Sequence, residues 1–119
     1  PRQNPARAAV RMADDLRAQA IIVFTKTGRM IPETAHMRPR HASIIALCPD
    51  QTTARSLALH RAVHPLIFHW DTAPAAETID QALDQIVQAG HLQKGKTVIL
   101  LSSRQALEEI SDSIQMRVV

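Results

Sequence analysis

Several residue types are scarce in this chain of 119 residues, and each scarcity excludes a class of function. A single cysteine, Cys48, excludes an internal disulfide and is typical of a reducing compartment such as the cytoplasm. With two Phe, one Trp and no Tyr, the chain has few rings on which nucleic acid bases could stack. No apolar run approaches the ~20 residues that a membrane-spanning helix needs. We therefore expect a cytoplasmic protein that binds neither nucleic acid nor membrane.

Glycine is scarce as well, and Gly28, Gly90 and Gly95 are the only three. Their spacing forms neither the GxGxxG fingerprint of dinucleotide-binding folds nor the GxxxxGK[ST] phosphate loop. The net charge of +3 is too small to indicate nucleic acid binding by itself. The chain has the length of one domain, and its 45% of hydrophobic residues are enough to form a core, so we expect a single domain over residues 1–119. Because the first residue is Pro1 and not Met, we expect a piece of a longer chain or a processed product.

Helix-like and strand-like segments alternate along the chain. Four short apolar runs predict strands, and most of them are rich in branched residues, which is typical of strands buried on both faces of a parallel sheet. These runs are Ala20–Phe24, Ser43–Leu47, Pro65–Phe68 and Thr97–Leu101. In the last segment, residues 114–118, apolar and polar residues alternate, which indicates an edge strand.

Four further segments predict helices. The pair Asn4–Pro5 favours a helix start, because asparagine caps a helix and proline lacks an N–H where none is needed. A short second helix is expected to end before Arg38. Asp50 is expected to cap the third helix, and Gly90 to end the fourth, which carries the clearest amphipathic stripe. The residues expected on the inner face of the third helix are Ala54, Leu57 and Ala58.

Strands that alternate with single helices predict an α/β fold. We expect a three-layer, open, mostly parallel five-stranded sheet with helices on both faces. The link Arg104–Asp112 has nine residues, and a parallel crossover needs about a dozen or more. The last strand is therefore predicted to be antiparallel, at the edge of the sheet. The segment Asp71–Ala76 is the most loop-like stretch inside the domain.

Ligands of open α/β sheets bind outside the carboxyl ends of the strands. The residues expected at that edge are Thr25–Arg29, Cys48, Trp70 and Ser102–Arg104. The first group supplies two hydroxyls, a Lys, an Arg and a Gly where a strand turns into a helix, a combination that suits an anion such as phosphate. A polar turn with solvated charges is the alternative interpretation of the same residues.

No complete catalytic constellation is present in these residues, so we predict no catalytic residue. His60 and His64 have the spacing of a zinc-binding helix, but Pro65 removes His64 from helical geometry, and we expect no metal site. Cys48 and Ser102 are nucleophiles by type, yet the sequence fixes no base beside either of them. For Cys48, a buried inert thiol is the favoured interpretation.

Several segments, in order and at matching spacing, resemble the C-terminal domain of pyruvate kinase along nearly the whole chain. They are Ala20–Arg29, Arg38–Pro39, Ile44–Ala46, Gln51–Thr52, Ala54–Arg55, Leu57–Leu59, Val63–Leu66, Lys94–Gly95 and Thr97–Ile99. The resemblance implies a non-catalytic allosteric and oligomerisation domain, whose parent enzyme transfers phosphate from phosphoenolpyruvate to ADP with Mg²⁺ and a monovalent cation such as K⁺. It implies as partners the rest of that chain, sister subunits in a tetramer, and a sugar phosphate or nucleotide effector.

The resemblance also implies which residues bind the effector's phosphate. They are Thr25, Lys26, Thr27, Gly28 and Arg29, to which we add Arg104 as a candidate from the same edge. Pro32 departs from the family pattern, because it falls in the first turns of the following helix. After the fourth strand, members of the family that bind a bisphosphate have a glycine-rich loop, whereas this chain has Glu108, Glu109 and Asp112 there. If these acidic side chains face the site, they would repel a bisphosphate, which favours a monophosphate effector or none.

Two other functions remain open at this point. One is a stand-alone protein of the same fold that binds a phosphorylated metabolite. The other is a small α/β enzyme that uses Cys48 or Ser102 as its nucleophile. The edge strand, residues 113–119, is expected near a subunit contact if the first interpretation holds, because unpaired edges invite pairing.

Overall fold

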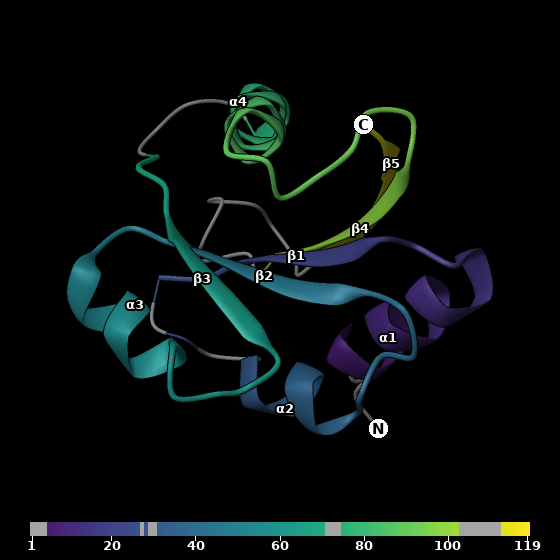
Figure 1. Ribbon diagram of the computed structural model, residues 1–119, viewed down its shortest axis with the longest axis horizontal. Helices are drawn as coiled ribbons and strands as arrows, with labels where there is room; N and C mark the ends of the chain where they lie inside the picture. Colours follow the sequence, from purple (N-terminus) through teal and green to yellow (C-terminus); the bar gives the residue numbers. More distant parts are fainter. Residues whose placement is uncertain (1–4, 27, 29–30, 71–74, 103–112) are drawn as a thin grey trace.

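A five-stranded sheet forms the centre of the computed structural model (Figure 1), which describes residues 5–26, 28, 31–70, 75–102 and 113–119. The strand order is β3-β2-β1-β4-β5. The strands are β1 (Ala20–Phe24), β2 (Ser43–Cys48), β3 (Val63–Ile67), β4 (Thr97–Ser102) and β5 (Ser113–Val118). The first four are parallel, and β5 pairs antiparallel with β4 at the edge, which confirms the predicted fold class.

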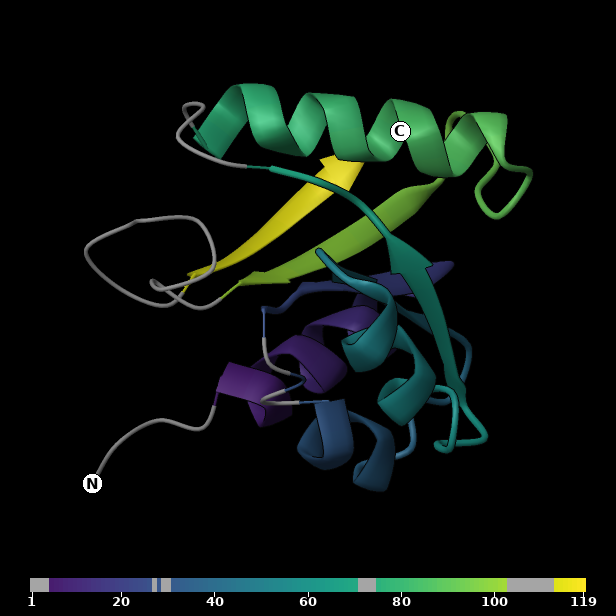
Figure 2. The ribbon, with the colours of Figure 1, turned by 90° about the vertical axis from the view of Figure 1, so that its left-hand side faces the viewer.

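Helices cover both faces of the sheet but in unequal number (Figures 1 and 2). Of the helices in the described ranges, three lie on one face and one lies on the other. The three are α1 (Pro5–Leu16), α2 (Ile31–His36) and α3 (Gln51–Leu57), and the single helix is α4 (Ala75–Gln88). Figure 2 shows that the end of β5 rises toward α4, so these two elements approach each other at the edge of the domain.

Alternation along the strands divides the core into two layers. In β1 all five residues are buried, and successive side chains point to opposite faces of the sheet. Ile21 and Val23 join the cluster under α1, α2 and α3, whereas Ile22 and Phe24 join the cluster under α4. Such strands need apolar residues at every position, and this is why the continuous run Ala20–Phe24 forms the strand.

The predicted helix boundaries are confirmed at several points. α1 begins at Pro5, and the carboxylate of Asp50 accepts a 2.7 Å hydrogen bond from the backbone N–H of Thr53, as an N-cap should. Gly90 follows α4 with a φ of +84°, in the left-handed region that ends many helices. Pro32 is the second residue of α2, where a proline fits the first turn.

Besides shifts of one or two residues at the ends of β2, β3 and β4, two details of the sequence-based expectation are wrong. Ala58 does not lie on the inner face of α3, because the helix ends at Leu57 and Ala58 is exposed at its C-cap. Residues 75–76, which were expected in a loop, form the beginning of α4. The remainder of that loop-like stretch, residues 71–74, lies outside the described residues.

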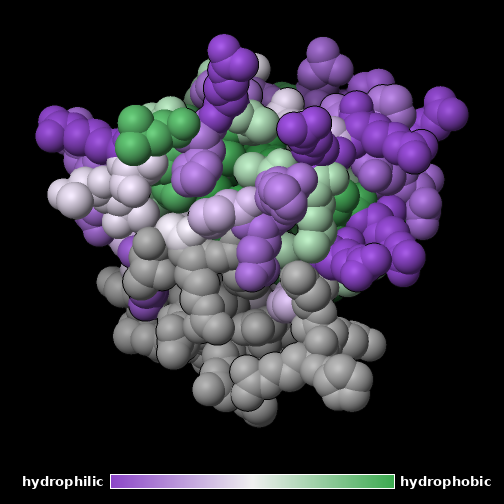
Figure 3. Space-filling view, turned by 90° about the horizontal axis from the view of Figure 1, so that it is seen from below, coloured by the Kyte–Doolittle hydropathy of each residue, from purple (hydrophilic) through white to green (hydrophobic). Residues whose placement is uncertain are grey.

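Figure 3 views the molecule from the side of α1, α2 and α3. Polar residues are spread over much of the described surface there, and apolar residues show between them. Among the described residues, no helix has both the length and the apolar character that crossing a bilayer would require.

Candidate functional site at the carboxyl edge of the sheet

The direction of the sheet's winding changes beside β1. From β1 the chain goes outward on one side to β2 and β3, and on the other side to β4 and β5. Ligands of open α/β sheets bind at such a switch point, outside the carboxyl ends of the strands. Phe24, at the end of β1, pairs with Leu47 of β2 and with Ser102 of β4. This register brings Thr25, Cys48 and Ser102 to one edge, as the sequence predicted.

The turn that follows β1 is fixed by two hydrogen bonds. The backbone N–H of Thr25 donates to the carbonyl of Leu47 at 2.9 Å, which extends the pairing of β1 with β2 by one residue. The Thr25 side chain is buried, and its Oγ1 accepts a 2.7 Å bond from the N–H of Gly28. Gly28 has a φ of +88°, which a glycine adopts without strain. Lys26, between them, is exposed to solvent.

The structure therefore places three of the six predicted phosphate-binding residues, Thr25, Lys26 and Gly28, at one turn of the carboxyl edge. The other three, Thr27, Arg29 and Arg104, lie outside the described residues. Glu108, Glu109 and Asp112, which were expected to disfavour a bisphosphate, lie outside them as well. Their predicted roles stay predictions.

Cys48 ends β2 as a fully buried thiol. Its Sγ donates a weak bond to the carbonyl of Leu66 on β3 at 3.7 Å. Burial, and secondarily the charge of Asp50, raises the pKa of this thiol above its ordinary value. A raised pKa disfavours the thiolate, which is the nucleophilic form, so this environment favours the inert thiol over a reactive one.

Ser102 ends β4 beside the antiparallel edge strand. Its hydroxyl lies 2.7 Å from the hydroxyl of Ser113, its partner in the register of β4 and β5. The Ser102 side chain is buried, and its hydroxyl hydrogen bond is made with another serine and not with a base. This arrangement joins the end of β4 to the start of β5, and among the described residues it pairs the Ser102 hydroxyl with another hydroxyl where a nucleophilic serine needs a base.

The aromatic residues gather near the same edge, where the sequence placed Trp70 but did not predict its contacts with Phe24 and Phe68. Trp70 stacks on Phe68, with ring centroids 5.9 Å apart, and meets Phe24 edge to face at 5.7 Å. Phe24 and Phe68 also meet edge to face, at 6.4 Å. The sequence did contain a signal for this cluster, because each aromatic residue ends a strand or follows one closely, and parallel strands end at the same edge of a sheet. The three rings close the α4 side of the core at the candidate site, and Trp70 remains half-buried.

The histidines that suggested zinc do not share a helix. His60 follows the end of α3, and His64 is an exposed residue on β3, as the effect of Pro65 predicted. In the part of the chain that the structure describes, no three His, Cys, Asp or Glu side chains are grouped so that they could hold a metal ion.

This fold agrees with a comparison against known protein families. Residues 3–115 match the model of the family described as pyruvate kinase, alpha/beta domain. The chain belongs to this family. The match spans the four parallel strands and each helix that the structure describes, and it includes the turn Thr25–Gly28.

Curated pyruvate kinases are similar to the domain over most of its length. A pyruvate kinase of Clostridium acetobutylicum is 38% identical over 88 residues, which are 74% of this chain and 18% of that protein. Pyruvate kinase isozyme G, chloroplastic, of Ricinus communis is 34% identical over 83 residues, or 70% of this chain and 19% of its own. Pyruvate kinase PKLR of Rattus norvegicus is 34% identical over 94 residues, which are 78% of this chain and 16% of that protein. The domain thus spans less than a fifth of each of these relatives.

Proposed function

We propose that the chain is the non-catalytic regulatory and assembly domain of a cytoplasmic pyruvate kinase. The observation that carries the proposal is the family match over residues 3–115, on a fold whose switch point lies at the Thr25–Gly28 turn. The relatives are named pyruvate kinases, and this domain would accordingly work with the rest of such a chain. An effector that prefers one quaternary state would shift the equilibrium between states and so change the activity of the whole enzyme.

Chemistry on phosphoenolpyruvate and ADP is assigned to the rest of the enzyme. At the carboxyl edge, Cys48 is a buried thiol, and the hydroxyl of Ser102 is hydrogen-bonded to the hydroxyl of Ser113. The resemblance implies that Mg²⁺ and the monovalent cation serve the parent enzyme, and for Mg²⁺ the described residues contain no group of three or more His, Cys, Asp or Glu side chains that could hold a metal ion. We therefore place both ions, and the transfer of the phosphoryl group, outside this domain.

The carboxyl edge is proposed to bind a phosphorylated effector. The hydrogen bond from the N–H of Gly28 to Oγ1 of Thr25 fixes the turn after β1. Exposed Lys26 offers a cation beside this turn. Lys26 forms no ion pair with a described residue. Thr27, Arg29 and Arg104 are proposed to complete the site, because hydroxyls and guanidinium groups add donors to phosphate oxygens. The half-buried ring of Trp70 provides an apolar boundary near this edge.

The edge strand β5 is proposed to carry a contact between subunits of a homo-oligomer, a tetramer in the whole enzyme. Within the described residues, β5 pairs with β4 on one side only. Met116 and Val118 lie on one face of β5 and remain 48% and 64% exposed. An edge strand with exposed apolar residues invites another strand to pair with it.

Titration calorimetry tests the effector site. The titrants are inorganic phosphate, sugar phosphates and nucleotides, added to the 119-residue chain. We expect Lys26→Ala with Arg29→Ala to weaken binding of the preferred phosphorylated compound by about tenfold or more, since each charge-assisted hydrogen bond contributes about 1.5–3 kcal/mol. The matched control is Arg61→Ala with Lys96→Ala, which removes two exposed cations near the opposite edge of the sheet. Equal affinity in the wild type and in the first double variant would exclude the effector site.

A further inference from the structure

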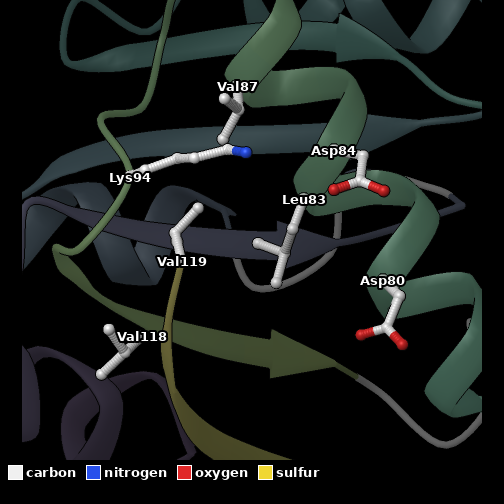
Figure 4. Close-up of a pocket in the computed structure, with 7 residues that line it drawn as sticks. All are labelled: Asp80, Leu83, Asp84, Val87, Lys94, Val118 and Val119. Atoms are coloured by element: carbon white, nitrogen blue, oxygen red, sulfur yellow. The ribbon is translucent and has the colours of Figure 1, made fainter.

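A groove lies between α4 and the end of β5, away from the carboxyl edge (Figure 4). Its volume is about 430 Å³. The residues that line it are Asp80, Leu83, Asp84, Val87, Lys94, Val118 and Val119. In Figure 4 the side chains of Leu83 and Val119 approach each other across the groove, and Asp80 and Asp84 lie along the same helix at one side of it. The groove thus has an apolar floor and an acidic wall.

The acidic wall carries charge that the domain does not neutralise. Asp80 and Asp84 are four residues apart on α4, so they are neighbours on the helix surface, and both are exposed. Neither carboxylate forms an ion pair with a described residue, and neither does Lys94 at the other side of the groove. After Lys94 is counted, the side chains that line the groove keep an excess of one negative charge. Charge complementarity therefore favours a cationic occupant with an apolar stem, such as an arginine side chain.

A cation of this kind is present on β5 itself. Arg117 pairs in register with Val98, which belongs to the core cluster under α4. Directly opposite residues of an antiparallel pair share a face, so Arg117 lies on the α4 face of the sheet. Among the described residues, the guanidinium donates one long, exposed bond of 3.4 Å, to the carbonyl of neighbouring Met116. Like the two carboxylates, it forms no ion pair with a described residue.

We propose that the groove receives Arg117 of the partner subunit, and that the partner's groove receives Arg117 of this chain. This rests on the proposed function, in which the edges of two β5 strands pair. Antiparallel pairing about a twofold axis perpendicular to the sheet puts both α4 helices on the same side and the two strands about 4.8 Å apart. The partner's Arg117 then stands on the α4 face of the joined sheet, the face that carries Asp80 and Asp84. Because a twofold interface is self-complementary, the contact forms twice.

Charge reversal followed by mixing tests this contact. The variants are Arg117→Glu and Asp80→Lys with Asp84→Lys, both in the 119-residue chain, and association is measured by sedimentation equilibrium. We expect each variant alone to associate about tenfold or more weakly than the wild type, because like charges then meet in both grooves. An equimolar mixture of the two variants should regain the association of the wild type, since in the mixed dimer each groove meets an opposite charge.

The outcomes separate this inference from the proposed function. Arg61→Glu, which reverses an exposed cation away from the groove, is the matched control and should leave association unchanged. Circular dichroism of each variant establishes that it is folded. If the wild type associates but the reversals have no effect, or if mixing restores nothing, the groove contact is wrong and pairing of β5 survives. If the folded wild type stays monomeric at all concentrations, the proposed assembly role fails and the groove contact fails with it.

Discussion

A Cβ atom placed on Gly28 would lie 3.3 Å from Cδ2 of Leu57, the buried residue of α3. The turn of the candidate effector site is thus packed closely against the helix that follows β2. The N–H of the same glycine donates to Thr25, and its φ of +88° is one that other residues adopt only with strain. The conformation of the turn and the position of α3 are therefore linked through Gly28.

Substitution of Gly28 measures this linkage. Gly28→Ala should lower the free energy of unfolding by about 1–2 kcal/mol from backbone strain alone, plus a further amount because Leu57 must move. Gly95→Ala is the matched control, since Gly95 has a φ of +84° and its Cβ would meet nothing within 4 Å. Urea unfolding of both variants gives the comparison. If Gly95→Ala costs as much as Gly28→Ala, the contact with Leu57 does not constrain the turn.

Asp50 should make stability depend on pH in acid. The N–H of Thr53 donates to the Asp50 carboxylate and lowers the pKa of that carboxyl below its ordinary 3.8. A lowered folded-state pKa gives stability that is present above about pH 3.8 and is lost as pH falls through the folded value. Asp50→Ala should therefore lower Tm at neutral pH. The difference in Tm between this variant and the wild type should become smaller as the solution is acidified. Asp50→Asn keeps a capping oxygen without the charge, and its Tm should show a weaker acid dependence. A wild type and Asp50→Ala pair whose Tm difference is the same at pH 7 and pH 2 would contradict this account.

Cys48 should be nearly inert in the folded domain. Because burial and Asp50 raise the pKa of the thiol, a thiol reagent such as iodoacetamide should modify it far more slowly in buffer than in denaturing urea. Asp50→Asn removes the smaller of the two causes and should increase the native rate only slightly. Mass spectrometry of timed samples gives the rates. Modification at comparable rates with and without urea would return Cys48 to the list of candidate nucleophiles.

The aromatic cluster should be visible through the single tryptophan. Phe24→Leu removes the edge-to-face contacts with both Phe68 and Trp70, which should cost about 1–3 kcal/mol and shift the emission of Trp70. Ile22→Val, on the same face of β1, is the control and should lower stability by about 0.5–1.5 kcal/mol without a shift in emission. Unchanged emission in Phe24→Leu would show that Trp70 is placed by other contacts.

Much of the fold was predictable because local signals were strong. The run Ala20–Phe24 is apolar at every position and forms β1 with the predicted ends. Asp50, Gly90 and the alternation in residues 114–118 each mark a boundary or an edge that the structure confirms. Boundaries were less certain where the signal was short. β3 begins at Val63, two residues before the predicted Pro65, because pairing with β2 extends the strand.

The candidate site was predictable in its location but not in its contacts. The position of Thr25 and Ser102 at one edge follows from the order of parallel strands. The bond from Ser102 to Ser113 depends on the register of an antiparallel pair, and the meeting of Phe24 with Trp70 joins residues separated by β2. Both depend on tertiary packing, which spacing along the chain does not encode.

The central claim is that the domain binds a phosphorylated ligand at its carboxyl edge and performs no chemistry on it. The most direct measurement is nuclear magnetic resonance of the ¹⁵N-labelled chain during titration with its preferred phosphorylated compound, with the phosphorus spectrum recorded in the same sample. We predict that the amides of Thr25, Lys26 and Gly28 and the indole of Trp70 shift, while the phosphorus signals show an intact compound. Amides that stay in place at this edge, or a compound that the chain converts, would contradict it.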